Sequence, residues 1–193
     1  SNSLLDLIVF GRSAAERACE ILDKKTKNHI EISNTSLDKI LSRFDTIRNS
    51  KGDIRTAELR DKMQRAMQRY APVYRDEKTL EKGIKIMKDN FSDFNNLSVS
   101  DKSLIWNTDL VESLELNNLL YQSLATLYSA YNRTESRGSH AREDYPDRDD
   151  KDWLKHTMVW VGEDGGSKFD YKPVELKTLT DEVETVALKA RTY

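Results

Sequence analysis

The sequence predicts a mainly α-helical protein: an antiparallel helical bundle of the three-helix type, followed by a C-terminal β-hairpin and an extended tail. Two observations support this fold class. Apolar residues recur at three- and four-residue steps through most of residues 3–134, which is the period of one helix face. Past residue 134, apolar and polar residues alternate on either side of a glycine-rich segment, which is typical of two strands joined by a turn.

Composition limits the class of protein. Of the 193 residues, 33% are charged and 37% hydrophobic, which predicts a soluble helical protein with a heavily solvated surface. The 31 basic and 33 acidic residues nearly cancel, so we expect no nucleic-acid partner. No hydrophobic stretch is long enough for membrane insertion. The single cysteine, Cys19, excludes an internal disulfide and fits a reducing compartment; its four-residue spacing from Ala15 predicts a buried packing residue.

The first helix is predicted from Ser3 to about Lys24. Ser3 and Asp6 have the spacing of a capping box, in which each side chain bonds the other residue's backbone amide. Six large apolar residues between positions 4 and 10 would point all round this helix. One neighbouring face could not cover them, so the sequence predicts a helix that is buried on more than one side.

Four further helices follow from the same periodicity. Asn34, Thr35 and Ser36 are suitable caps for the second helix, which residues 49–53 end. The third helix begins near Asp53 and stops at Pro72, because proline breaks helices; its apolar face holds Leu59, Met63, Ala66, Met67 and Tyr70. The fourth has the most regular apolar stripe: Leu80, Ile84, Met87, Phe91 and Phe94. The fifth runs from about position 108 to about position 134 and would bury Leu110, Leu114, Leu120, Leu124, Leu127 and Tyr131. Long helices joined by short polar links are typical of an antiparallel bundle.

The last part of the chain has a different pattern. β-branched and aromatic residues alternate in "LKHTMVWV", residues 154–161, and "FDYKPVELK" returns after the turn "GEDGGSK". The tail "TLTDEVETVALKARTY" has weak periodicity and is predicted to be extended. We therefore divide the chain into a first helix, residues 1–24, a helical bundle, residues 25–134, and a charged loop with hairpin and tail, residues 135–193.

Residues 133–153 hold the densest charge in the chain, with four arginines among seven carboxylates. Exposed ion pairs are worth only about 0–1 kcal/mol each, so a loose solvated loop is one interpretation. We favour an ordered network, because Gly138, Tyr145, Pro146 and Trp153 fix backbone or bury surface and arginine forks bind carboxylates directionally. The predicted members of this network are Arg137, His140, Arg142, Asp144 and Arg148.

The residues alone indicate no catalytic or metal site. The three histidines, His29, His140 and His156, lack ligand spacing, and neither a His-Glu-x-x-His motif nor a pair of Cys-x-x-Cys motifs is present. The glycines at 162–166 belong to a hairpin turn and do not lead into a helix, so they cannot place a phosphate at a helix start. We therefore predict no catalytic residue and no metal ligand in this chain.

Three segments resemble the succinate dehydrogenase and fumarate reductase flavoprotein subunits. They are "ESRGSHAREDYPDRDDKDWLKHT" at residues 135–157, "SNSLLDLIVFGRSAAE" at residues 1–16, and "TLTDEVETVALKARTY" at residues 178–193. The Glu-Ser-Arg-Gly-x-His-x-Arg part is also similar to L-aspartate oxidases. The Trp-Leu-Lys-His-Thr continuation and the tail favour the succinate dehydrogenase type over that oxidase and over a free-standing helical adaptor.

The resemblance implies that this chain is the C-terminal part of a larger flavoprotein. Its first helix would close the FAD-binding domain, with Ser1, Ser3 and Leu4 at the edge of the FAD site. A helix N-terminus there would stabilise negative charge on the reduced flavin. The Arg-Leu-Gly that precedes this motif in the family is missing, as are the dinucleotide fold, the flavin-linking histidine and the proton-donating arginine. No FAD is therefore expected to bind to this chain alone.

The same resemblance implies the function and partners of the intact protein. It would oxidise succinate to fumarate in the tricarboxylic acid cycle, reduce covalent FAD, and pass electrons through an iron-sulphur subunit to a quinone. It would lie peripherally on the cytoplasmic side of a bacterial inner membrane or on the matrix side of the mitochondrial one. This chain would be a structural brace for the FAD-binding and capping domains and would contact the iron-sulphur subunit.

Overall fold

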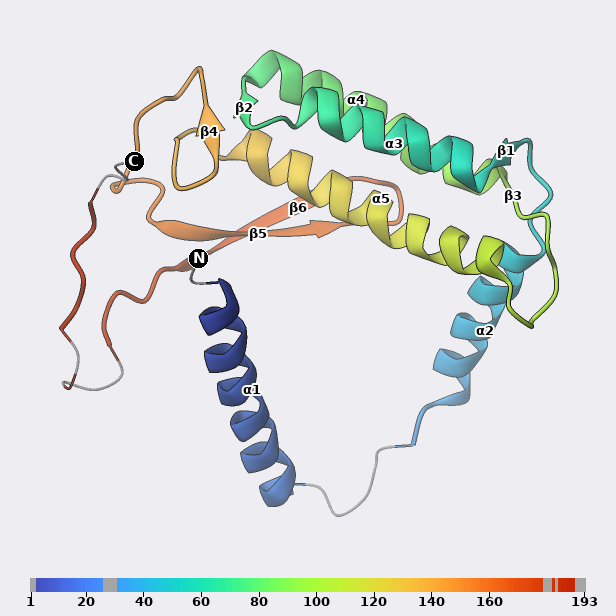
Figure 1. Cartoon of the computed structure of the whole chain (residues 1–193), viewed down its shortest axis with the longest axis horizontal. Helices are drawn as coiled ribbons and strands as arrows, with labels where there is room; N and C mark the ends of the chain where they lie inside the picture. Colours follow the sequence, from blue (N-terminus) through green and yellow to red (C-terminus); the bar gives the residue numbers. More distant parts are fainter. Residues whose placement is uncertain (1–2, 26–30, 179–181, 183, 190–193) are drawn as a thin grey trace. The chain divides into compact units, whose positions relative to one another are not determined.

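The computed structural model describes residues 3–25, 31–178, 182 and 184–189 (Figure 1). By its internal contacts the chain divides into two compact units, Ser1–Arg43 and Phe44–Tyr193. Each unit is considered by itself below. Within the described residues the chain is mainly helical with a small β component, which confirms the predicted mainly α-helical class.

The first unit contains the long helix α1, Ser3–Lys25. Its described side chains, residues 4–22, are all exposed, and the six large apolar ones between positions 4 and 10 are 53–74% exposed. Exposed Arg12–Glu16 and Arg17–Glu20 ion pairs lie along it. The predicted burial of Cys19 is wrong, because its side chain is exposed in this unit. Ser33 caps the next helix, α2, Asn34–Arg48, with its hydroxyl accepting from the Ser36 amide at 3.3 Å.

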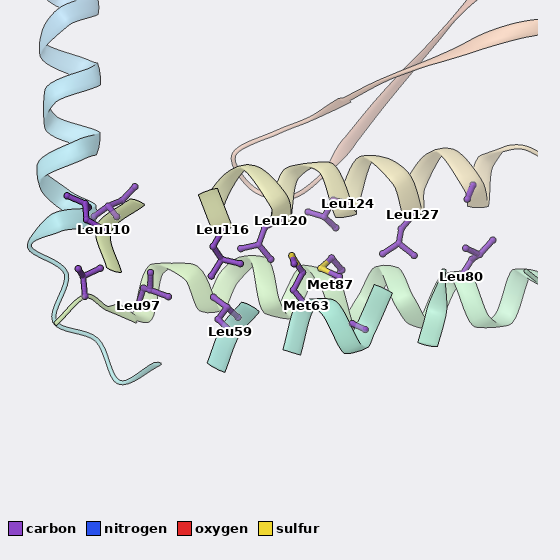
Figure 2. Packing of buried hydrophobic residues seen from close by; sticks show 14 residues of the cluster. Leu59, Met63, Leu80, Met87, Leu97, Leu110, Leu116, Leu120, Leu124 and Leu127 are labelled. Atoms are coloured by element: carbon purple, nitrogen blue, oxygen red, sulfur yellow. The ribbon is translucent and has the colours of Figure 1, made fainter. Parts of the chain in front are cut away.

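The core of the second unit lies between three helices that pack against one another: α3, Thr56–Tyr70, α4, Glu77–Asp93, and α5, Thr108–Asn132. Figure 2 shows their buried side chains meeting along the helices. The fully buried members are Leu59 from α3, Leu80 and Met87 from α4, and Leu116, Leu120, Leu124 and Leu127 from α5. All of these residues except Leu116 belong to the predicted apolar stripes. The helical period of the sequence therefore identified the core.

Side-chain caps and one close glycine contact fix these helices. Asp76 caps α4 by accepting from the Thr79 amide at 2.9 Å, and Asn107 caps α5 by accepting from the Leu110 amide at 2.8 Å. Such caps satisfy amides that have no partner inside the helix.

Gly83 of α4 is buried, and a Cβ there would lie 2.6 Å from the Tyr70 Cβ and 3.0 Å from Leu127 Cδ2. Only glycine therefore permits this approach of α4 to its two neighbours.

Short parallel strand pairs lie at the ends of the bundle and join segments that are distant in the sequence. The periodicity did not predict them. At one end β1, Ile54–Arg55, pairs with β3, Leu97–Ser98, which follows a 3-10 turn at Phe94–Asn96. At the other end β2, Tyr74–Arg75, pairs with β4, Ala141–Arg142, so that Arg75 lies opposite Arg142. The second pair anchors the charged loop to the turn between α3 and α4.

The predicted hairpin is confirmed as β5, Lys155–Val161, paired antiparallel with β6, Ser167–Pro173. It packs along α5 (Figure 1). Tyr128 of α5 donates to the Gly165 carbonyl in the hairpin turn at 2.7 Å, and Tyr171 of β6 donates to the Asn132 side chain at 2.7 Å. The described tail residues after Pro173 form no helix or strand. Over the described ranges, every helix is too short or too polar to cross a lipid bilayer.

Candidate functional site

The charged segment begins where α5 ends and folds into a series of tight turns. Arg137 and His140 exchange two backbone hydrogen bonds, at 2.9 and 3.0 Å, which closes the first turn. Gly138 lies inside that turn at φ +59°, in the left-handed region that side chains disfavour. The Ser136 hydroxyl accepts from the Arg142 amide at 2.8 Å and donates to the Tyr145 carbonyl at 2.8 Å. The backbone therefore holds the charged side chains in fixed directions.

Glu135 is the buried anion of this network, with a side chain that is 0% exposed. It accepts from Arg133, from Arg137 at 2.8 and 3.0 Å, and from the Asp149 amide at 2.8 Å. Burial alone would raise the pKa of Glu135, but the hydrogen bonds from Arg137, Asp149 and Arg133 outweigh it and hold the pKa below its ordinary value. Glu135 is thus a fixed carboxylate with both oxygens occupied.

Arg142 is the buried cation, 2% exposed. Its Nη1 atom donates to the carbonyls of Ala130, Tyr131 and Arg133 at 3.0–3.1 Å. These carbonyls lie at the C-terminal end of α5, which carries the negative end of the helix dipole. Its Nε and Nη2 atoms form a two-point ion pair with Asp144, both at 2.8 Å. Hydrogen bonding to Asp144 also raises the pKa of Arg142.

Asp144 extends this link from α5 to α4. Its second oxygen accepts from the Glu77 amide, at the N-terminus of α4, at 2.8 Å. The hydrogen bonds from Arg142 oppose desolvation and, with that amide, lower the pKa of Asp144 to about 2. The Arg142–Asp144 pair therefore connects the C-terminus of one helix to the N-terminus of another, each with the charge that its helix dipole favours.

His140 lies between two elements of the network. Its Nε2 atom lies 3.2 Å from the Arg133 carbonyl, and its Nδ1 atom lies 3.1 Å from Arg75 Nη1. The Arg133 carbonyl can only accept a hydrogen bond, and the Arg75 guanidinium can only donate one. We therefore assign the neutral tautomer, with the proton on Nε2 and the lone pair on Nδ1. Burial, followed by the nearby charges of three arginines, lowers the pKa of His140, although the bond to Arg133 opposes this. Both ring nitrogens are occupied.

Arg148, the last predicted member, lies at the edge of the network. It pairs with Asp150 at 2.8 Å, and Asp150 also accepts from Arg137 at 2.7 Å. The Nη1 atom of Arg148 donates to the Lys189 carbonyl at 2.6 Å, and this bond attaches the tail to the loop. All five predicted members thus lie in one connected set of hydrogen bonds, together with Glu135.

An open cleft of about 680 Å³ borders this network. Trp153 forms one wall, with the Arg133 guanidinium 5.0 Å and the Lys155 ammonium 4.8 Å from its ring. The basic residues of the lining are Arg75, Arg133, Arg137, His140, Lys155 and His156. The remaining lining is apolar or carries hydroxyls, and the described lining contains no carboxylate.

Arg75 is the member of this site that sequence analysis missed. It lies in β2, 65 residues before His140, inside a turn whose composition carries no functional signal. Only the parallel pairing of β2 with β4 brings it to the charged loop. No spacing pattern in the sequence around Arg75 indicates that it belongs to the site.

The residues predicted at the edge of an FAD site lie at the start of α1. Ser1 is outside the described residues, Ser3 is the first residue of α1, and Leu4 is 74% exposed. His156 is exposed on β5, and His29 lies outside the described residues. Over the described ranges, no three His, Cys, Asp or Glu side chains are grouped closely enough to hold a metal ion.

Residues 60–193 match the family model described as the fumarate reductase flavoprotein C-terminal region. The chain is 54% identical, over its whole length, to the succinate dehydrogenase flavoprotein subunit of Rickettsia bellii and covers 32% of that protein. It is 42% identical to the mitochondrial succinate dehydrogenase [ubiquinone] flavoprotein subunit of Oryza sativa, of which it covers 30%. In Escherichia coli quinol fumarate reductase, a chain of 32% identity superposes with a TM-score of 0.85, over 93% of this chain and 31% of that one.

The fold described above is thus shared with Escherichia coli quinol fumarate reductase, and the sequence is similar to succinate dehydrogenase flavoprotein subunits. The chain belongs to the C-terminal domain family of the succinate dehydrogenase and fumarate reductase flavoprotein subunits. It spans about a third of the length of the relatives that it matches. The L-aspartate oxidase and adaptor alternatives are not favoured by these matches.

Proposed function

We propose that this chain is the structural C-terminal domain of a flavoprotein that oxidises succinate to fumarate through FAD. The electrons would pass to an iron-sulphur subunit and then to a quinone, on a membrane to which the flavoprotein is peripheral. The names of the matched succinate dehydrogenase and quinol fumarate reductase chains support this reaction class. The chemistry itself would belong to the FAD-binding and capping domains.

The occupied network is the observation that favours a structural role. A general acid or base must reach a reacting group through an open hydrogen-bonding position. The Glu135 oxygens and both His140 nitrogens are bonded within the chain, and Arg142 is buried against α5 and Asp144. The loop therefore fits a brace that fixes the end of the bundle rather than a set of catalytic groups.

Helix α1 fits a second part of this role. Its apolar side chains at positions 4–10 are exposed in their own unit, and a large apolar surface of this kind is typical of an interface. We propose that an FAD-binding domain covers it. Ser1, Ser3 and Leu4 would then lie at the edge of the flavin, where the N-terminus of α1 would favour negative charge on the reduced ring.

The proposal is tested by reconstitution. The purified chain is incubated with excess FAD, desalted, and examined by its visible spectrum and by dye reduction with succinate. We expect a colourless, inactive protein with an intact helical circular dichroism spectrum. Retained FAD together with succinate-dependent dye reduction would show that the catalytic groups lie in this chain, and would overturn the structural assignment.

A second test reads the coding sequence upstream of Ser1. The proposal requires an open frame that continues through Arg-Leu-Gly into an FAD-binding domain, and a nearby gene for a cysteine-rich iron-sulphur subunit. A frame that instead opens directly before Ser1 would overturn the assignment to a larger flavoprotein.

A further inference from the structure

Arg75 differs from the arginines around it because it has no carboxylate partner among the described residues. Arg133 and Arg137 pair with Glu135, Arg142 pairs with Asp144, and Arg148 pairs with Asp150. The hydrogen bonds of Arg75 instead reach neutral groups: its Nε donates to the Pro72 carbonyl at 2.7 Å, and its Nη1 donates to His140 Nδ1 at 3.1 Å.

These two bonds orient the guanidinium but leave much of it unused. A guanidinium has five N–H donors, and the two bonds occupy one on Nε and one on Nη1. One Nη1 hydrogen and both Nη2 hydrogens therefore remain for an oxyanion, which a guanidinium can bind at two points. Burial lowers the pKa of Arg75 because no carboxylate offsets the loss of solvation, yet an arginine remains charged at neutral pH.

Arg75 lines the 680 Å³ cleft together with a second cation that lacks a carboxylate partner in the described chain. That cation is Lys155, whose ammonium lies 4.8 Å from the Trp153 ring and 4.1 Å from the Tyr171 ring. Ser129 and Thr157 add hydroxyls to the wall. Because the described lining contains no carboxylate, nothing in it repels a negative ligand.

We propose that this cleft is a binding site for a small, doubly charged oxyanion, with Arg75 as its two-point ligand and Lys155 as its second cation. His140 and Pro72 hold the Arg75 fork in place. Two unneutralised cations in one cleft favour a ligand with two negative charges, such as phosphate or a phosphate monoester. The site uses only residues of this chain, so it does not depend on the function proposed above.

Inorganic phosphate is the probe. The purified 193-residue chain is titrated by isothermal calorimetry at low ionic strength, in a buffer without competing anions. We expect saturable binding at one site, weakened about tenfold or more in Arg75→Gln, because hydrogen bonds to charged groups contribute energies of that scale. Arg75→Lys keeps the charge without the fork, so we expect it to bind phosphate with an intermediate affinity. Lys155→Gln should weaken binding as well.

The matched control is Arg65→Gln, which removes an exposed arginine that pairs with Asp61 on α3. We expect it to bind phosphate as the unchanged chain does. The second readout is the imidazole resonance of His140, which should shift as phosphate saturates the site, because its Nδ1 bonds Arg75. Absence of saturable binding, an equal loss in Arg65→Gln and Arg75→Gln, or an unmoved His140 resonance at saturation would overturn the site. Circular dichroism of each variant shows that a loss of binding is not a loss of folding.

Discussion

Arg75 Nη1 and His140 Nδ1 lie 3.1 Å apart, although 65 residues separate them in the sequence. The other nitrogen of His140 bonds the Arg133 carbonyl at the end of α5. The imidazole therefore joins the turn between α3 and α4 to the last turn of α5. Its value to the fold comes from bonding two partly buried groups at once, so removal of the ring should take one hydrogen bond from each.

We predict that His140→Ala lowers the free energy of unfolding by about 1–3 kcal/mol, because it removes one hydrogen bond from the Arg75 guanidinium and one from the Arg133 carbonyl. His156→Ala, an exposed histidine on β5, is the matched control and should change it little. Thermal and urea unfolding of the three proteins measure the effect. Equal melting temperatures for all three would mean that the charged segment does not stabilise the bundle.

Arg142 should matter more than any other member of the network. Arg142→Ala removes the ion-pair partner of Asp144 and one donor from each of three carbonyls at the end of α5. Breaking a buried pair typically costs about 3–5 kcal/mol. Arg148→Ala is the control, because its side chain is 28% exposed whereas that of Arg142 is 1% exposed, and ion pairs contribute less as exposure rises, down to about 0–1 kcal/mol at the surface. Urea unfolding should separate the two variants clearly, and a similar loss in both would contradict the assigned burial.

Stability should fall in acid through Asp144. Its folded pKa is about 2, against an ordinary value of 3.8, so the unfolded chain binds a proton that the folded chain resists. The stability from this group is present above pH 3.8 and is lost as pH falls through about 2. Asp144→Asn should flatten the dependence of unfolding free energy on pH in this window. Asp147→Asn, a matched change on an exposed residue of the same segment, serves as the control, and an identical slope in both variants would contradict the prediction.

The sequence predicted the helices and the hairpin but could not place the network's long-range partners. Leu80, Met87 and Leu124 lie on stripes whose period is a local property, so they identify the core without knowledge of the fold. The β2–β4 pairing, in contrast, joins two-residue strands that have no periodicity to detect. Cys19 shows the opposite error: small residues at four-residue steps indicated close packing, whereas the side chain is exposed in its own unit.

The approach of α4 to its neighbours predicts a large effect of one methyl group. Gly83→Ala would place a Cβ 2.6 Å from the Tyr70 Cβ, so the helices must separate, and overpacking of this kind costs about 1–3 kcal/mol. Gly11→Ala is the matched control, because nothing lies within 4 Å of a Cβ at Gly11 in α1. Alanine favours a helix over glycine by about 1 kcal/mol, so this variant should stabilise α1. Thermal unfolding and helical circular dichroism measure both, and a stabilised Gly83→Ala would show that the contact can relax.

The exposed apolar side chains of α1 predict association. Each large side chain left in water forfeits roughly 1.5–3 kcal/mol, and those at positions 4–10 are 53–74% exposed. We therefore expect the chain to associate through α1 as concentration rises, or to exchange the amides of residues 4–10 rapidly. Light scattering over a wide dilution range and hydrogen exchange measure these two outcomes. Replacing Leu4, Leu7 and Phe10 with glutamine should abolish association, whereas Arg12→Gln, a change on the same helix, should leave it intact. A strict monomer with fully protected amides at residues 4–10 would mean that the chain itself covers this helix on all sides, and an FAD-binding domain would then have no apolar face on α1 to cover.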